Sequence, residues 1–140
     1  MATFKKMFVT DKSLETGGVW HELGAGVKIK VARMGTPEYN ATLRRLAQPH
    51  KNLARRVLDD SDLIEESDLV VFKEIEAQAM AKHVLVDWEG FTESDEKGSP
   101  VVPYSEAKAL EYIQQSDDFR KLLTELAGKA SNFKEATKGN

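Results

Sequence analysis

The centre of the predicted fold is the stretch DLVVFKEIEAQAMAKHVLVDWEG, residues 68–90. Its apolar residues recur at helical spacing, which predicts one long helix from about Leu63 or Asp68 to Val86. Gly90 is a natural terminator for this helix. A helix that is apolar over so much of its circumference is normally packed on several sides. Its two apolar arcs comprise Leu69, Phe72, Ile75, Ala79, His83 and Val86, and Val70, Ala77, Ala81 and Leu85.

Upstream of this helix the sequence predicts a β-hairpin. Two short strands, Val19–Leu23 and Val27–Ala32, flank a connection that contains two glycines. Lysines alternate with apolar residues in the second strand, which is typical of a half-buried strand. A two-stranded ribbon is marginal alone, so its apolar face should pack on the helices. The residues before about Leu14 are expected to form a mobile or weakly extended tail.

Further helices are expected on both sides of the long one. Thr36-Pro37 is a helix start, and that helix should continue to about Leu46, before Pro49. A second stretch, Lys51–Leu58, and an acidic helix entry, Asp59–Asp62, should follow.

Downstream, residues 91–103 should form a loop or short hairpin. Ser105 and Ser116 precede amphipathic runs and are predicted N-caps, for helices Glu106–Gln115 and Asp117–Ala127. Phe133 extends the apolar stripe of the second of these helices. The fold class is therefore α+β and predominantly α-helical, with an N-terminal hairpin packed on about four to five helices. A single domain, 15–133, would lie between tails at 1–14 and 134–140.

Composition is that of an ordinary soluble domain. The chain has 140 residues, 41% hydrophobic and 31% charged, with a formal net charge of −3. Cysteine is absent, which excludes disulfides and thiolate metal sites. We find no apolar run of the length that a signal peptide or membrane span needs. No membrane association is expected.

The sequence offers no recognisable catalytic, metal or cofactor site. Gly24-Ala25-Gly26 lacks the third glycine of a dinucleotide-binding loop, because Ile29 stands in that place. The three histidines are far apart in sequence, and His83 is expected to be a hydrogen-bonded core residue. The acidic loop Glu93–Glu96 does not match a calcium-binding loop. We therefore expect a non-enzymatic protein.

Charge is divided sharply between two adjacent segments. Residues 41–58 contain no acidic residue, whereas residues 59–78 contain eight acidic residues and one lysine. Adjacent antiparallel helices could neutralise each other across a solvated seam, which is the interpretation we favour. Alternatively, the basic face could bind an acidic partner or nucleic acid, although no aromatic residues interleave the arginines. The basic residues of the segment are Arg44, Arg45, Lys51, Arg55 and Arg56.

The order of several segments resembles that of the tail assembly chaperones of long-tailed bacteriophages and prophages. The resemblance is carried by residues 81–91, AKHVLVDWEGF, then Val102-Pro103-Tyr104-Ser105-Glu106 and Ala130-Ser131-Asn132-Phe133. Upstream, Val27–Arg33, Gly35, Tyr39-Asn40 and the basic stretch around Pro49 also resemble the family. The resemblance covers about Trp20 to Phe133.

This resemblance implies a protein of the infected cell's cytoplasm that is absent from the mature virion. Such a chaperone binds the tape measure protein, keeps it soluble and helps recruit tail tube subunits. A longer form made by ribosomal frameshifting near Ala127-Gly128-Lys129 would also be in keeping with the family.

Candidate partner contacts are aromatic residues near turns and the basic segment. Trp20 lies on the ribbon face opposite Val19 and Leu23, which suits a partner or self-association. For Trp88 we favour a role in capping the core over partner contact. The full candidate set is Trp20, Arg44, Arg45, Arg55, Arg56, Trp88, Phe91 and Tyr104. Other possible functions are a small nucleic-acid-binding or regulatory protein that uses Arg44–Arg56, and a minor structural tail or head-completion protein.

Overall fold

The computed structural model describes residues 2–50, 52 and 66–134. The expected helical stretch Lys51–Leu58 and the acidic segment Asp59–Asp62 lie outside the described residues, apart from Asn52, as do residues 135–140 of the expected C-terminal tail. The elements in chain order are α1 (Phe4–Phe8), α2 (Lys12–Gly17), β1 (Val19–Gly24), β2 (Val27–Val31), α3 (Pro37–Ala47), η1 (Gln48–His50), α5 (Glu66–His83), β3 (Leu85–Glu89), α6 (Glu106–Gln115), α7 (Asp117–Gly128) and η3 (Ala130–Phe133).

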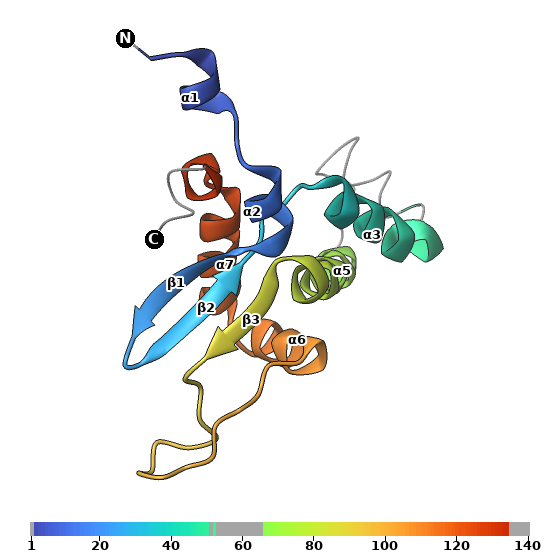
Figure 1. Ribbon diagram of the computed structural model, residues 1–140. Coiled ribbons are helices and arrows are strands. Elements are labelled where there is room, and N and C mark those ends of the chain that lie inside the picture. The colour runs from blue at the N-terminus through green and yellow to red at the C-terminus, as the bar shows by residue number, and fades with distance from the viewer. Residues whose placement is uncertain (1, 51, 53–65, 135–140) are drawn as a thin grey trace.

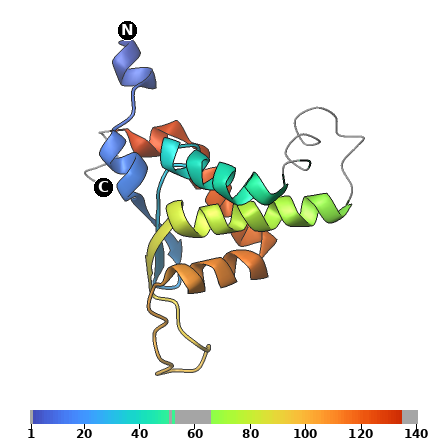
Figure 2. The ribbon, with the colours of Figure 1, turned by 90° about the vertical axis from the view of Figure 1, so that its right-hand side faces the viewer.

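The fold is α+β and mainly helical, as the sequence predicts, with an antiparallel three-stranded sheet in the order β1-β2-β3. The sheet forms one layer and the helices form the other (Figures 1 and 2). Helix α5 contacts β3, and α7 contacts β2. Helix α3 packs on α5, and α6 packs against both α5 and α7. The sheet is thereby covered by helices on one face.

The alternation of β2 decides which face of the sheet is buried. Ile29 and Val31 are fully buried, while Lys28 and Lys30 point to the other face. The buried pair packs in one core cluster with residues of α5, α6 and α7, among them Met80, Ile113 and Leu123. The predicted hairpin and its buried face are therefore confirmed.

The long helix ends earlier than predicted, and a third strand follows it. Helix α5 stops at His83, and residues 85–89 form β3 instead of completing the helix. Trp88 pairs with Ile29, and Leu85 pairs with Val31. The prediction was wrong here because β2 has a second free edge, and pairing with that edge outweighs the local helical pattern. Gly90 does end the element, but the element is a strand.

Packing of α5 on several sides is confirmed for its second half. Five residues there are buried, namely Ile75, Ala77, Ala79, Met80 and Ala81. In the first half, Leu69, Val70 and Phe72 are exposed, although the sequence places them on the two apolar arcs. The sequence pattern thus predicts the buried circumference of the helix correctly only in the half where neighbouring elements pack against it; the elements that pack most closely against α5 are α3, α6 and β3.

The expected N-terminal tail is instead two short helices. Thr3 caps α1 by accepting a hydrogen bond from the Lys6 amide, and Asp11 caps α2 through the Ser13 amide. Helix α2 is held to the body by Arg33, whose guanidinium donates to the Glu15 carboxylate at 2.8 Å. The contact between Glu15 and Arg33 joins residues that are far apart in the sequence, so a local sequence pattern does not predict it.

The predicted helix N-caps and the predicted packing of Phe133 agree with the structure. Thr36, Ser105 and Ser116 each accept a hydrogen bond from the amide three residues later, at 3.0–3.2 Å. Residues 91–103 form the expected short hairpin-like loop, with an isolated bridge between Thr92 and Val101. Phe133 is fully buried at the end of η3.

Candidate protein-binding site

An aromatic cluster forms where β3 leads into the loop before α6. Three of the predicted site residues meet here: the ring centroid of Trp88 lies 5.6 Å from that of Phe91 and 5.0 Å from that of Tyr104. Tyr112 of α6 completes the cluster, 5.2 Å from Trp88 and 5.4 Å from Phe91. Edge-to-face and tilted contacts of this kind stabilise a cluster beyond simple burial.

Hydrogen bonds fix the inner part of this cluster. The indole N–H of Trp88 donates to the Val102 carbonyl at 2.9 Å, and its side chain is only 3% exposed. The Tyr104 hydroxyl donates to the Leu85 carbonyl at 2.8 Å, and burial raises the pKa of Tyr104. Both bonds join the segment before α6 to β3. Trp88 is therefore part of the hydrophobic core, and it lies in strand β3.

The outer part of the cluster opens into an apolar groove, which we call the aromatic groove. It has a volume of about 240 Å³ and is lined by Phe91, Tyr112, Gln115, Ser116 and Phe119. Its walls come from three places: the end of β3, helix α6 and the first turn of α7. Ser116 ends α6 and caps α7, so this cap sets the corner between the two helices and the position of Phe119.

Tyr112 and Phe119 were missed as site residues from the sequence. Phe119 begins the regular apolar stripe of α7, a pattern typical of core residues. In the structure it is half-buried, whereas Leu123, one turn further along α7, is fully buried. Phe119 could have been recognised by its position in the first turn of α7, directly after α6 ends. Neighbouring elements cover only one side of a side chain at such a position.

Trp20 lies on the other face of the sheet. It pairs with Lys30, and the ammonium groups of Lys28 and Lys30 lie 4.8 Å and 5.8 Å from its ring centroid. These cation–π contacts partly cover the indole. Lys28 also forms a salt bridge of 3.3 Å with Glu89 of β3. Trp20 therefore belongs to a charged sheet face, separate from the aromatic groove.

The predicted basic surface is seen only in part. Arg44 and Arg45 are exposed on the last turn of α3, while Arg55 and Arg56 lie outside the described residues. Neither arginine of α3 forms a salt bridge within the described part of the chain. On α5, Glu76 pairs with Arg120 of α7 at 2.6 Å and Glu74 accepts from Gln114 of α6. Glu74 and Glu76 thus join α5 to α6 and α7, and the neutral seam between the basic and acidic segments stays a prediction because part of each segment lies outside the described residues.

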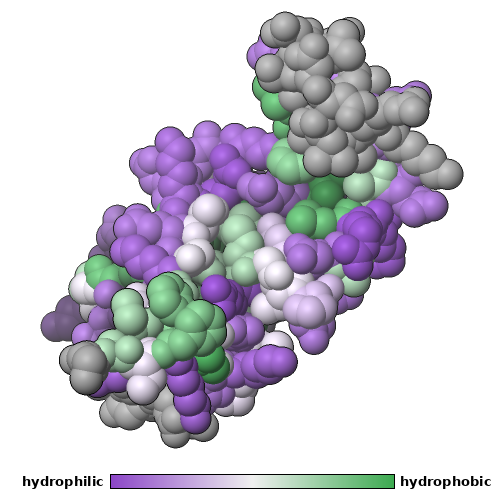
Figure 3. Space-filling view, turned by 90° about the horizontal axis from the view of Figure 1, so that it is seen from above, coloured by the Kyte–Doolittle hydropathy of each residue, from purple (hydrophilic) through white to green (hydrophobic). Residues whose placement is uncertain are grey.

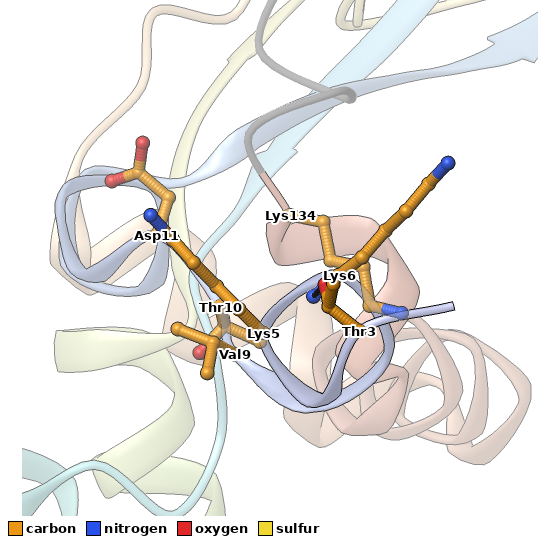
Figure 4. A pocket seen from close by; sticks show the side chains of 7 residues that line it. All are labelled: Thr3, Lys5, Lys6, Val9, Thr10, Asp11 and Lys134. Carbon is orange, nitrogen blue, oxygen red and sulfur yellow. Dashed lines mark hydrogen bonds between the residues drawn. The ribbon is translucent and has the colours of Figure 1, made fainter. Parts of the chain in front are cut away.

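Helix α1 is a second apolar surface. Phe4, Met7 and Phe8 are 75%, 50% and 62% exposed, and the helix has no buried residue. Figure 3 looks down on this end of the molecule and shows apolar side chains of α1 at the surface. Beside them lies a hollow of about 600 Å³ whose lining includes Lys5, Lys6 and Lys134 (Figure 4).

The sequence comparison identifies a family. The family described as YdaY prophage protein matches residues 34–140, which extend from the end of the β-hairpin through α3, α5, β3, α6, α7 and η3. The chain belongs to the YdaY prophage protein family. All five residues of the aromatic groove lie in the matched part of this YdaY-family chain, whereas α1, α2 and the β1–β2 hairpin precede it. Neither the curated proteins nor the solved structures contain a match.

His83 of this YdaY-family protein links two helices. His83 Nε2 and Thr42 Oγ1 share a hydrogen bond of 2.6 Å that joins α5 to α3, as expected for a hydrogen-bonded histidine. Within residues 2–50, 52 and 66–134, no group of three or more His, Asp or Glu side chains could hold a metal ion. None of the helices described is long and apolar enough to cross a membrane.

Stability should fall as the pH is lowered through the histidine range. Burial, and then the nearby Lys82, lower the pKa of His83 below 6.5, although Glu38 and Glu106 act in the opposite direction. The folded state therefore binds fewer protons than the unfolded state below about pH 6.5, so acidification favours unfolding. Burial lowers the pKa of His21 in the same direction. Urea unfolding at pH 7.5, 6.5 and 5.5 should show this decrease, and His83→Gln should reduce its slope. An identical slope in the variant would contradict the assignment to His83.

Proposed function

We propose that this YdaY-family protein is a phage tail assembly chaperone. It would bind the tape measure protein, keep it soluble and help recruit tail tube subunits around it, without catalysing a reaction. It would act in the cytoplasm of the host cell and be absent from the mature virion. Membership of a prophage protein family and the resemblance in residues 20–133 both support this proposal.

The aromatic groove is the observation that carries the proposal. Aromatic side chains in a partly desolvated groove are the usual anchors of protein–protein contacts. An amphipathic helix places anchors at i, i+3 or i+4, and i+7, which suits a groove that runs along a helix corner. A tape measure protein is long and helical, and covering its apolar stripe would suppress its self-association. Because the groove is open at the surface, such masking would be reversible.

Co-expression with a candidate tape measure protein tests the proposal. The wild-type chain should increase the soluble fraction of the tape measure protein, and Phe119→Ser should reduce that increase severalfold. Val101→Ser is the matched control, because Val101 is apolar and 63% exposed but does not line the groove. If the tape measure protein stays equally insoluble with and without the wild-type chain, the chaperone function is wrong.

A second candidate is nucleic-acid binding through the segment Arg44–Arg56. It is favoured by the exposure of Arg44 and Arg45, for which the described residues supply no acidic partner. Binding to phosphates would be strongly salt-dependent. Retention on DNA or heparin that falls with salt, and that Arg44→Glu combined with Arg45→Glu abolishes, would support this function. Recovery of the protein in purified phage particles would instead favour a structural component.

A further inference from the structure

Helix α1 carries apolar side chains that the described part of its own chain leaves exposed. Phe4 and Phe8 are one helical turn apart, and their ring centroids lie 5.2 Å from each other. They therefore form one exposed aromatic pair, with Met7 beside them. Apolar side chains gathered on the surface of a soluble protein commonly mark an interaction site.

This helix cannot reach the aromatic groove of its own chain. Residues 9–11 alone connect it to α2, and three extended residues span about 10 Å. The end of that link is fixed, because the Asp11 amide donates to the Phe133 carbonyl at 2.6 Å. Figures 1 and 2 place α1 at one end of the molecule and the loop that follows β3 at the other. An intramolecular contact is therefore excluded by distance.

Charge makes the two surfaces complementary. Residues 2–10 contain two basic residues, Lys5 and Lys6, and no acidic one. The residues that neighbour the groove lining in the sequence are mainly acidic, and we call them the acidic rim: Glu111 precedes Tyr112, Asp118 precedes Phe119, and the loop that begins at Phe91 carries Glu93, Asp95 and Glu96. These five acidic residues are exposed. Glu111 forms a salt bridge of 3.0 Å with Lys108, whose ammonium lies near the Tyr112 ring, so the charge of the acidic rim rests on the other four residues.

We infer that α1 of one copy docks into the aromatic groove of a second copy. Phe4 and Phe8 are the anchors, and Lys5 and Lys6 face the acidic rim. The groove has room for one of the two rings, because a cavity of roughly 150 Å³ already accommodates benzene and this groove measures about 240 Å³; the second ring then packs at its open mouth. We call α1 the arm. Two copies that exchange their arms make two such contacts, and each contact holds the chains together through the short link between α1 and α2.

This contact uses the same groove as the proposed function, so α1 and a partner protein compete for it. Self-association is measured with this chain alone. Failure of the arm exchange therefore leaves the chaperone proposal untouched, and failure of the chaperone proposal leaves the arm exchange untouched.

Sedimentation velocity over a range of protein concentrations tests the inference. The wild-type chain should dimerise or form larger closed assemblies. Phe4→Ser with Phe8→Ser should raise the dissociation constant by about tenfold or more, because these are the central anchors. Lys5→Glu with Lys6→Glu should weaken the assembly, and the effect should diminish at high salt. Val101→Ser is again the control and should leave the assembly unchanged. Circular dichroism should show that every variant retains its helical content.

A mixing experiment decides whether the arm meets this groove. The arm variant Phe4→Ser/Phe8→Ser and the groove variant Phe119→Ser should each be monomeric alone. Mixed in equal amounts, they should form heterodimers, because one intact arm and one intact groove remain. The inference is overturned if the wild type is monomeric at all concentrations, if the arm variant assembles like the wild type, or if the mixture gives no heterodimer. A monomer whose α1 binds anionic lipid vesicles would assign this helix to membranes instead.

Discussion

Replacing Gly90 by alanine is expected to lower the free energy of unfolding by about 3–5 kcal/mol. Gly90 follows β3 with a φ of +95°, a conformation that L-residues rarely adopt. A Cβ at this position would overlap the carbonyl oxygen of Gly26 and lie 3.0 Å from the Cα of Val27. All these atoms are backbone, so the hairpin turn between β1 and β2 would have to move.

Gly98→Ala is the matched control for this prediction. Gly98 has a similar φ of +82°, but a Cβ there would meet nothing within 4 Å. Its cost should be limited to the left-handed backbone, about 1–2 kcal/mol. Urea unfolding followed by circular dichroism measures both variants. Equal losses would show that the close approach of Gly90 to the hairpin is unimportant.

Phe133→Ala should lower the free energy of unfolding by about 3–5 kcal/mol, because it leaves a cavity in the core. Phe133 is the largest fully buried side chain among the described residues, although it lies close to the C-terminal end of the described chain. Its carbonyl also accepts the hydrogen bond from Asp11, so its displacement should loosen α2 as well. Faster amide hydrogen exchange in α2 would report this second effect.

Phe8→Ala removes the same side chain from an exposed position and serves as the comparison. Phe8 is 62% exposed, so the isolated chain should lose less than about 0.5 kcal/mol. Measurements at low protein concentration keep any self-association from contributing. A loss for Phe133→Ala no greater than that for Phe8→Ala would mean that η3 is not part of the folded core.

Elements with local signals could be predicted from the sequence. The β1–β2 hairpin is encoded by alternation around two glycines, and α3, α6 and α7 begin at hydroxyl caps that occupy the expected positions. Strand β3 could not be predicted, because residues 85–89 continue a helical pattern and become a strand only by pairing with β2, more than fifty residues earlier. Long-range pairing overrode local propensity there.

The candidate site was predictable to a similar extent. Aromatic residues near turns identified Trp88, Phe91 and Tyr104, which meet in one cluster. Trp20 was grouped with them on residue type alone, and the pleat of the sheet places it on the opposite face. Phe119 could be recognised only from the angle between α6 and α7, which no single segment of the sequence specifies.

The contact between Lys134 and α1 has a practical consequence for anyone who handles this protein. The Lys134 ammonium donates to the Met7 carbonyl at 2.7 Å, so the two ends of the described chain are neighbours. An affinity tag or fluorescent reporter joined just before α1 or directly after Lys134 would start from the same corner of the molecule. Such fusions would crowd the aromatic helix that begins the chain and leave the far end free, so untagged material is the right reference for every assembly measurement.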